Sequence, residues 1–457
     1  MNGTLSEKEV AALRSGVGCE VLTGSDPEYD GARRIWNGMI DRRPSAIVRP
    51  ASIAEVMQVV RLVREYRLPF TVRGGGHSLP GKSVADGAVM IDLSTMKAIQ
   101  VDGSSHSAVV QGGVKWGELD KEAERYRLAT TGGVISSTGV AGLTLGGGIG
   151  WLMGKHGLSC DNLISADLVT AEGAHLSLSA TQNEELFWAI RGGGGNFGIV
   201  TALEFRMHPL ESVEGGVLLY PRATAMDLLR KYRDITLTAP DELTAYAALM
   251  TGHGNQLAAV AFCHSGARAE AAGAGKQFFL ADAPIADMTG EKKYTEIQTM
   301  LDFTAPAGLN YYFKCPFLRE LTDDALRVIV EASVEAPSEQ TQVVIEHMHG
   351  AASRTPAAET AFGLRRVHYS INIMPAWSDP ALAEKCIAWA RGLSAELEKF
   401  GGSDSYVNYL GDEGAAAVRA SYGVNFERLQ QLKKKYDPEN FFSGNQNIAP
   451  ATEVSSR

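Results

Sequence analysis

The sequence predicts an α+β fold in which a glycine-rich part and a sheet-forming part are separate domains. The first observation is a strand–helix–strand order between residues 46 and 72, followed by three glycine runs that end near residue 200. The second is a series of strands and helices in residues 210–403 that do not alternate. Strands and helices in this order indicate an antiparallel sheet covered by helices on one face. A chain of 457 residues, 45% of them hydrophobic, is long enough for two or three domains.

The first elements form a βαβ unit. Residues 46–50 read as a strand ended by proline, and residues 68–72 as a second strand. Between them, Ser52 and Glu55 form a capping box for a helix over about 53–66. A parallel crossover of this kind delivers the segment after residue 72 to the carboxyl end of a strand. Further strands are predicted at 88–93 and 107–111.

The segment delivered there is Arg73-Gly74-Gly75-Gly76-His77-Ser78. Consecutive glycines have no side chains to pack and weaken any regular element. They suit a turn whose backbone N–H groups approach a ligand closely, most plausibly its phosphates. The alternative is an ordinary glycine turn that carries an exposed histidine.

Two more glycine runs follow, at 136–151 and 191–200. The run at 136–151 has contiguous glycines and no clean GxGxxG that opens a helix, as a Rossmann dinucleotide site would have. The run at 191–200 leads into a strand. Three such runs are hard to explain as ordinary turns. They indicate one extended ligand that lies along the backbone of several segments.

The predicted antiparallel sheet belongs to residues 210–403. Apolar runs at 216–220 and 257–263 and alternating patterns at about 341–349 and 367–376 read as strands. Helical spacing of apolar residues predicts helices at about 224–236, 322–335 and 379–399. The face of the sheet without helices is then free to enclose a substrate.

The formal net charge of −10 argues against nucleic acid or an anionic membrane as a partner. The basic run Lys433-Lys434-Lys435 reads as the solvated face of a helix. The five cysteines are scattered and never at CxxC spacing, which fits buried thiols in a reducing compartment and no zinc site. Residues 1–16 lack the apolar core of a signal peptide, and no run is long enough to span a membrane, so we expect a cytoplasmic protein.

The three glycine runs resemble the FAD-binding half of the vanillyl-alcohol-oxidase (PCMH-type) superfamily, in its berberine-bridge-enzyme-like branch. The chain end resembles the closing segment of that family, at Tyr406-Val407-Asn408-Tyr409 and at residues 436–448. The resemblance spans nearly the whole chain and is looser between residues 210 and 403. It implies a PCMH-type FAD-binding domain of two α+β subdomains, residues 1–209 plus 404–457, and a substrate domain, residues 210–403, whose sheet lies over the flavin.

The resemblance also implies which residues bind FAD. They belong to the glycine runs and the chain end: Arg73, Gly74, Gly75, Gly76, His77, Ser78, Thr138, Gly139, Gly142, Gly147, Gly148, Gly150, Asn162, Gly195, Gly198, Ile199, Val200, Asn445 and Asn447.

One departure from the family concerns the flavin linkage. Many relatives attach the flavin through a histidine and through a cysteine in a Gly-x-Cys-Pro-Thr segment. Here that segment is Gly133-Val134-Ile135-Ser136-Ser137, and isoleucine has no nucleophile. We therefore expect FAD with a single covalent link, through His77. This is similar to the bacterial members with one attachment, such as 6-hydroxynicotine oxidase and the oxidases of secondary metabolism.

The activity implied is that of a flavoprotein oxidase. A small organic substrate would lose hydride from a C–O or C–N carbon to flavin N5, and O2 would reoxidise the flavin and give H2O2. Two alternatives stay open: a dehydrogenase that uses another electron acceptor, and a flavoprotein that sequesters a drug or metabolite. The sequence leaves the substrate and the oligomeric state undetermined.

Candidate catalytic residues come from two segments. The family's sugar oxidases use tyrosines at the segment that here holds Tyr406 and Tyr409, and Tyr406 is the expected base for an alcohol; read as a strand, this segment would place the two rings on opposite faces. His368, Ser370 and Asn372 alternate on a predicted strand and so share one face, which the resemblance puts over the flavin. That face would equally suit an edge exposed to water.

A metal site is not expected. Glu346, His347 and His349 lie close together in the sequence but lack a fourth ligand at metal-binding spacing.

Overall fold

The computed structural model describes residues 5–252, 254–401, 405–411 and 413–452. The ends of the expected FAD-binding domain, residues 1–4, 404 and 453–457, lie outside the described residues. Near the N-terminus the strands pair in the order β1-β2-β4-β3, with β2, β4 and β3 parallel to one another. The elements of this layer are α1 (Glu7–Gly16), β1 (Glu20–Leu22), α2 (Tyr29–Ala32), β2 (Ala46–Arg49), α3 (Ile53–Glu65), β3 (Phe70–Arg73) and β4 (Val89–Asp92).

The helix α3 forms because its apolar residues recur on one face. Val56, Val59, Val60 and Val63 are buried against the sheet, and the Ser52 hydroxyl accepts a hydrogen bond from the Glu55 N–H at the first turn. The βαβ unit expected from the sequence is therefore present. It delivers the first glycine turn to the carboxyl end of β3.

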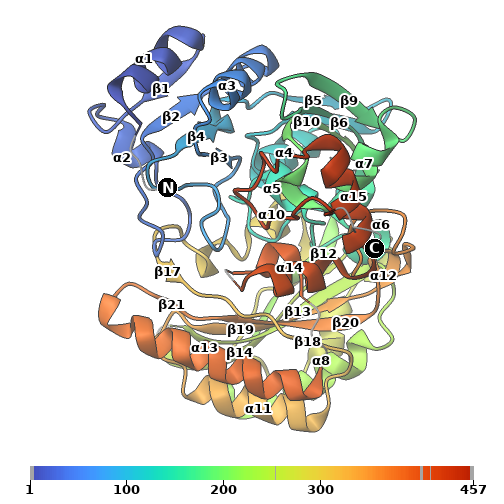
Figure 1. Ribbon diagram of the computed structural model, residues 1–457. Coiled ribbons are helices and arrows are strands. Elements are labelled where there is room, and N and C mark those ends of the chain that lie inside the picture. Colours follow the sequence, from blue (N-terminus) through green and yellow to red (C-terminus); the bar gives the residue numbers. More distant parts are fainter. Residues whose placement is uncertain (1–4, 253, 402–404, 412, 453–457) are drawn as a thin grey trace, which may run out of the picture.

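A second layer is an antiparallel sheet with the strand order β5-β6-β10-β8-β9. A helix within the second glycine run and the helix that precedes the third run pack into the same core as this sheet (Figure 1). The elements of this layer are β5 (Ile99–Asp102), β6 (Ser107–Gln111), α4 (Trp116–Glu124), α5 (Val140–Leu145), α6 (Met153–His156), β8 (Leu163–Val169), β9 (His175–Ser179), α7 (Glu184–Ile190) and β10 (Ile199–Arg206). β7 (Leu128–Ala129) and β11 (His208–Pro209) pair with each other in a separate two-stranded sheet.

The third layer is the large antiparallel sheet predicted for residues 210–403, with the order β15-β12-β14-β13-β19-β20-β18 and with β16 paired to β12. Its strands are β12 (Val213–Pro221), β13 (Leu243–Gly252), β14 (Asn255–His264), β15 (Ala286–Asp287), β16 (Gly290–Lys292), β18 (Phe317–Leu318), β19 (Gln342–Met348) and β20 (His368–Met374). A separate ribbon pairs β17 (Asn310–Tyr311) with β21 (Ala376–Trp377).

Helices cover one face of this sheet, as expected. Figure 1 shows α11 (Asp323–Val334) and α13 (Ala383–Leu397) along its lower side, and α8 (Ala225–Thr236) packs into the same core. On β19 and β20, Val343, Ile345, Tyr369, Ile371 and Ile373 point into that core. The alternate residues of both strands therefore face the glycine-rich layers. The remaining helices of this region are α9 (Arg268–Ala271), α10 (Tyr294–Thr299) and α12 (Gly350–Arg354).

The chain end returns to the glycine-rich layers through α14 (Ala415–Tyr422) and α15 (Phe426–Tyr436). Two expectations about it were wrong. Residues Val407–Tyr409 form a 3₁₀ turn and not a strand, so Tyr406 and Tyr409 lie on the same side, with ring centroids 4.8 Å apart. Lys433 is not solvated: its side chain is fully buried against Asp437.

Among the described residues no helix is long and apolar enough to cross a membrane, and no cluster of His, Cys, Asp and Glu side chains could hold a metal ion. The cysteines are free thiols. Cys160, Cys263 and Cys386 are buried, whereas Cys19 and Cys315 are only half-buried.

Candidate active site

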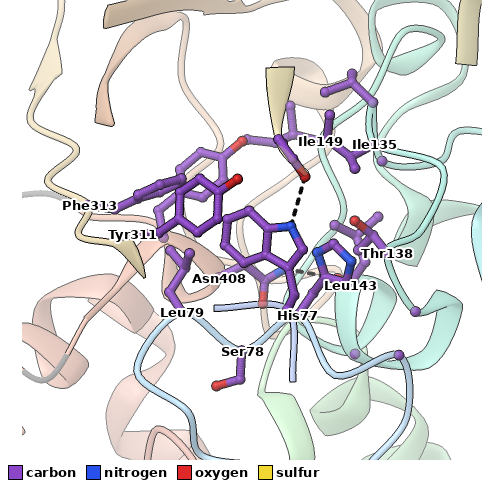
Figure 2. A pocket seen from close by; sticks show the side chains of 18 of the residues that line it. His77, Ser78, Leu79, Ile135, Thr138, Leu143, Ile149, Tyr311, Phe313 and Asn408 are labelled. Carbon is purple, nitrogen blue, oxygen red and sulfur yellow. Dashed lines mark hydrogen bonds between the residues drawn. The ribbon is translucent and has the colours of Figure 1, made fainter. Parts of the chain in front are cut away.

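A cavity of about 1090 Å³ lies between the glycine-rich layers and the open face of the large sheet. Figure 2 shows His77 beside Thr138 and Leu143, with Tyr311 and Phe313 on the other side of the lining side chains that are drawn. One end is lined by backbone of the glycine runs and by the chain end. The other is lined by side chains of β12, β13, β14, β19 and β20.

The first and second glycine runs meet backbone to backbone at the cavity wall. A Cβ atom added to Gly75 would lie 2.3 Å from the Gly139 nitrogen, and one added to Gly139 would lie 2.4 Å from the Gly75 nitrogen. No larger residue fits at either position. Gly76 also has a φ of +73°, in the region that favours glycine. Bare backbone therefore lines the cavity here.

His77 projects from this turn into the cavity wall. Its ring stacks on the indole of Trp36, with centroids 5.2 Å apart, and Trp36 in turn stacks on Tyr311. The Nε2 atom lies 2.9 Å from the Ser137 Oγ, which fixes the ring orientation and leaves Nδ1 toward the other side. Burial, with a smaller contribution from Lys115, lowers the pKa of His77 to about 4. The imidazole is therefore neutral at physiological pH and can act as a nucleophile.

The third glycine run is joined to the chain end by a buried ion pair. The Lys433 ammonium donates to the Asp437 carboxylate at 2.7 Å, to the Asn196 carbonyl at 2.7 Å and to the Phe442 carbonyl at 3.0 Å. Asn196 and Phe442 both line the cavity. Lys433 thus holds two parts of the wall together from behind.

Most of the residues expected to bind FAD line the cavity, and some do not. Those in the lining are Gly74, Gly75, Gly76, His77, Ser78, Thr138, Gly139, Gly142, Gly195, Gly198, Ile199, Val200 and Asn445. Those outside it are Arg73, Gly147, Gly148, Gly150, Asn162 and Asn447.

Three of the residues outside the lining have structural roles. The Arg73 side chain pairs with the buried Asp92 and so ties the end of β3 to β4. A Cβ on Gly150 would lie 1.8 Å from the Gly132 carbonyl oxygen, which makes this glycine a packing requirement. The Asn162 amide donates to the carbonyls of His156 and Leu158.

A group of buried polar side chains lines the cavity at the sheet. The Tyr409 hydroxyl donates to the two carboxylate oxygens of Glu346 at 3.0 and 3.1 Å. Tyr246 pairs with Glu346 in the β13–β19 register and so lies beside it on the same face. Asn372, on β20, completes the group. Within the described residues, the Tyr246 hydroxyl and both amide atoms of Asn372 have no hydrogen-bond partner.

Burial raises the pKa of Glu346 to about 7, against the opposing effect of its polar neighbours Asn372 and Tyr409. Burial and the carboxylate of Glu346 raise the pKa of Tyr409 well above its ordinary value. Tyr409 therefore stays protonated and donates, while Glu346 can gain or lose a proton near neutral pH.

Tyr406 and His368 lie outside the cavity lining. The Tyr406 hydroxyl accepts hydrogen bonds from the Gly148 N–H and the Asn408 amide, each at 2.8 Å, and burial raises its pKa. His368 shares the face of Asn372 but lies at the far end of β20, with its ring against Phe317. Its Nδ1 is 2.7 Å from the Arg366 carbonyl.

Sequence reasoning did not single out Glu346 and Tyr246 as site residues. Glu346 was weighed only as a metal ligand, although the alternation 344, 346, 348 puts it on the same face of the sheet as Asn372. Tyr246 lies in an apolar strand and carries no local signal. Its position beside Glu346 is a property of the strand pairing.

The residues present fit FAD. The cavity is long and has bare glycine backbone at one end, and the buried Oδ1 atom of Asn445 in its wall has no partner within the described residues. A Cβ on Gly142 would meet nothing within 4 Å, so the second run also faces open space. Backbone N–H groups of this kind bind phosphates without cationic side chains.

The fold and this cavity define a flavin-dependent oxidoreductase, and the comparisons agree. The profile of the FAD binding domain family matches residues 44–179, and that of the berberine and berberine-like family matches residues 405–449. A FAD-linked oxidoreductase of Dictyostelium discoideum is 33% identical over 437 residues, 93% of each chain. The (R)-6-hydroxynicotine oxidase of Paenarthrobacter nicotinovorans is 31% identical over 457 residues, 94% of this chain and 96% of that one.

A crystal structure of 6-hydroxy-D-nicotine oxidase from Arthrobacter nicotinovorans superposes with a TM-score of 0.85 at 28% identity, covering 95% of this chain and 98% of the other. The chain therefore belongs to the berberine-bridge-enzyme-like family of FAD-linked oxidoreductases. This confirms the fold class and the family expected from the sequence.

Proposed function

We propose that the protein is an oxidase that binds FAD through a single covalent bond to His77 and oxidises a small organic substrate at a C–O or C–N bond. The observation that carries the proposal is the cavity with His77 and the glycine runs at one end and the Glu346, Tyr409 and Asn372 side chains in its sheet wall. Bound FAD supplies a two-electron acceptor that takes hydride at N5 and returns the electrons to O2, giving H2O2.

Three polar side chains at the sheet wall act in this reaction. The Glu346 carboxylate lies in the cavity lining and accepts the proton of a substrate hydroxyl, because a base with a pKa of about 7 is partly ionised at neutral pH. The Tyr409 hydroxyl holds the carboxylate in place. The Asn372 amide lies beside Glu346 and lowers the pKa of that carboxyl, and its carbonyl oxygen, which has no partner among the described residues, binds the substrate group. This assigns to Glu346 the base role that the sequence suggested for Tyr406.

The covalent bond is tested by denaturing the purified protein in acid and separating it on a gel. Flavin fluorescence should stay with the wild-type chain and be lost in His77→Ala. Ser137→Ala, which removes the partner of Nε2 but not the nucleophile, should slow attachment without abolishing it. Release of flavin from the wild-type chain would rule out the bond.

The reaction class is tested with the reduced enzyme. Rapid reoxidation by air, with H2O2 formed in equal amount to the substrate oxidised, is expected of an oxidase. Very slow reoxidation by O2 together with fast reoxidation by an artificial acceptor would instead indicate a dehydrogenase. Binding of a compound at one equivalent without any turnover would indicate sequestration.

A further inference from the structure

The wall that the large sheet presents to the cavity is apolar and is hollowed by small residues. Ala248 on β13 and Ala259 on β14 face each other in the strand register, and Ala261 on β14 extends the same hollow. Leu219, Leu257 and Met250 line it further out. Larger side chains at the alanine positions would fill this space.

The segment opposite the sheet is apolar as well. Met300, Leu301 and Leu309 line the cavity there. Phe303 and Met288 also line it while being 71% and 47% exposed, so they mark its mouth. An apolar molecule would therefore leave water along an apolar path.

Unpartnered buried polar atoms in the sheet wall are confined to one place. Among the described residues they belong to Tyr246 and Asn372, beside Glu346. Further out, the Gln342 amide already donates to the Thr304 carbonyl, and the charged residues Lys292, Glu296 and Glu339 lie where solvent reaches them. A sugar would place several hydroxyl groups against the alanine and methionine wall without partners, and each such group costs about 1–3 kcal/mol.

The apolar wall is long. From β19, which carries Glu346, to β12, which carries Leu219, the sheet runs through β13 and β14. Three strand spacings of about 4.8 Å each give a width of about 14 Å. That width accommodates several fused rings. The thioethers of Met250, Met288, Met300 and Met374 line the same space, and sulfur makes favourable contacts with aromatic rings.

We infer that the substrate is an apolar alcohol with several rings, whose hydroxyl-bearing carbon lies at the Glu346 end and whose ring system lies over Ala248 and Ala259. The inference rests on the proposed function. In the reaction the carbinol C–H bond breaks and its electron pair leaves as hydride to FAD, the hydroxyl proton passes to Glu346, and a ketone forms. O2 then takes the two electrons together with two protons, the transferred hydrogen and the proton released by Glu346, and becomes H2O2.

The test uses a series of alcohols with increasing ring content, cyclohexanol, tetralol and fluorenol, with glucose and cellobiose as the polar comparison. Each is titrated against the oxidised holoenzyme, with the flavin spectrum reporting binding, and is then mixed anaerobically to follow flavin reduction. The apparent affinity should rise by about tenfold or more from cyclohexanol to fluorenol, because each buried methylene is worth about 0.8 kcal/mol.

Ala248→Phe should abolish this rise while cyclohexanol binds within about twofold of wild type. Ala248→Leu serves as a milder variant if the larger ring impairs folding, and flavin content reports folding in each. Ala54→Phe, on the exposed face of α3, is the matched control for an added aromatic ring and should behave as wild type.

Three outcomes would overturn the inference: better binding of glucose or cellobiose than of the ring alcohols, no spectral response to any ring alcohol, or an unchanged ring dependence in both Ala248 variants. Tight, Ala248-dependent binding of fluorenol without flavin reduction would support the apolar binding site and contradict the proposed oxidation.

Discussion

At the scale of single residues, Glu346 combines a buried position with a carboxyl group that changes charge near neutral pH. Its folded pKa is raised to about 7 by burial, and the Tyr409 hydroxyl contacts both of its oxygens. A carboxylate in such a setting is a common form of general base. The pH dependence of flavin reduction should therefore follow this group.

We expect the rate of flavin reduction by an alcohol substrate to rise about tenfold for each pH unit up to about pH 7 and then to level off, because only the ionised carboxylate accepts a proton. Glu346→Gln should lower the rate by about 10²–10⁴-fold and flatten the profile. Anaerobic stopped-flow measurements between pH 5 and 9 give both quantities.

Glu339→Gln is the matched control, because this carboxylate also lines the cavity but is exposed to solvent. It should keep the wild-type profile. Tyr406→Phe should also keep it, since Tyr406 does not line the cavity and its hydroxyl bonds to Gly148 and Asn408. A flattened profile in Tyr406→Phe, with Glu346→Gln unchanged, would return the base role to Tyr406.

At the scale of elements, helix α15 holds the cavity wall through a residue that does not itself line the cavity. The Lys433 ammonium and the Asp437 carboxylate have side-chain exposures of 0% and 1%. The pair bonds to the carbonyls of Asn196 and Phe442 and to the N–H groups of Phe441 and Phe442. Lys433 is thus a positioning residue for the third glycine run and the chain end.

Lys433→Met should weaken FAD binding by about tenfold or more and lower stability by about 3–5 kcal/mol, because it leaves the Asp437 charge buried without its partner.

The double variant Lys433→Met/Asp437→Asn removes both charges and should recover much of the stability. It should not recover FAD binding, because the Asn196 and Phe442 carbonyls still lack the Lys433 ammonium as a hydrogen-bond donor. FAD titration in a His77→Ala background measures binding, and thermal unfolding measures stability. Equal recovery of both would reduce Lys433 to a stability role.

At the scale of the whole molecule, the glycine-rich layers and the large sheet are joined through more than the cavity. Asp120 on α4 is fully buried and accepts a hydrogen bond from the Gln298 amide on α10 at 2.9 Å. The same amide also donates to the Gly133 carbonyl, beside the Ile135 segment. Burial raises the pKa of Asp120 from its ordinary 3.8 to about 7.

This pKa gives a signed prediction for stability. Between pH 4 and 7 the folded protein keeps the Asp120 proton, whereas the unfolded chain has lost it. The contribution of this protonated carboxyl to the free energy of unfolding is therefore full below about pH 4 and is lost as the pH rises through 7. Each pKa unit corresponds to about 1.4 kcal/mol. Asp120→Asn should remove this dependence and gain stability relative to wild type as the pH is raised from 5 to 8. Chemical denaturation at both values measures it. Parallel curves for the two proteins would show that the carboxyl has its ordinary pKa.

The sequence by itself determined the features that depend on local backbone geometry or on a single side chain. Consecutive glycines predicted backbone that approaches closely, and Gly75 and Gly139 do lie against each other's backbone. The period-two pattern predicted that Asn372 shares one face of β20 with His368, and Asn372 lines the cavity whereas His368 does not. The family resemblance with Ile135 led to the expectation of one covalent bond.

The tertiary structure decided what depends on chain segments that meet only after folding. Glu346 and Tyr409 are 63 residues apart in the chain, and their hydrogen bond exists because a 3₁₀ turn at the chain end meets β19. Strand pairing brought Tyr246 beside Glu346, and packing of α15 buried Lys433, whose neighbours in sequence indicated a solvated face. Burial sets the pKa of such groups, and burial is a property of the assembled fold that no local pattern of residues carries.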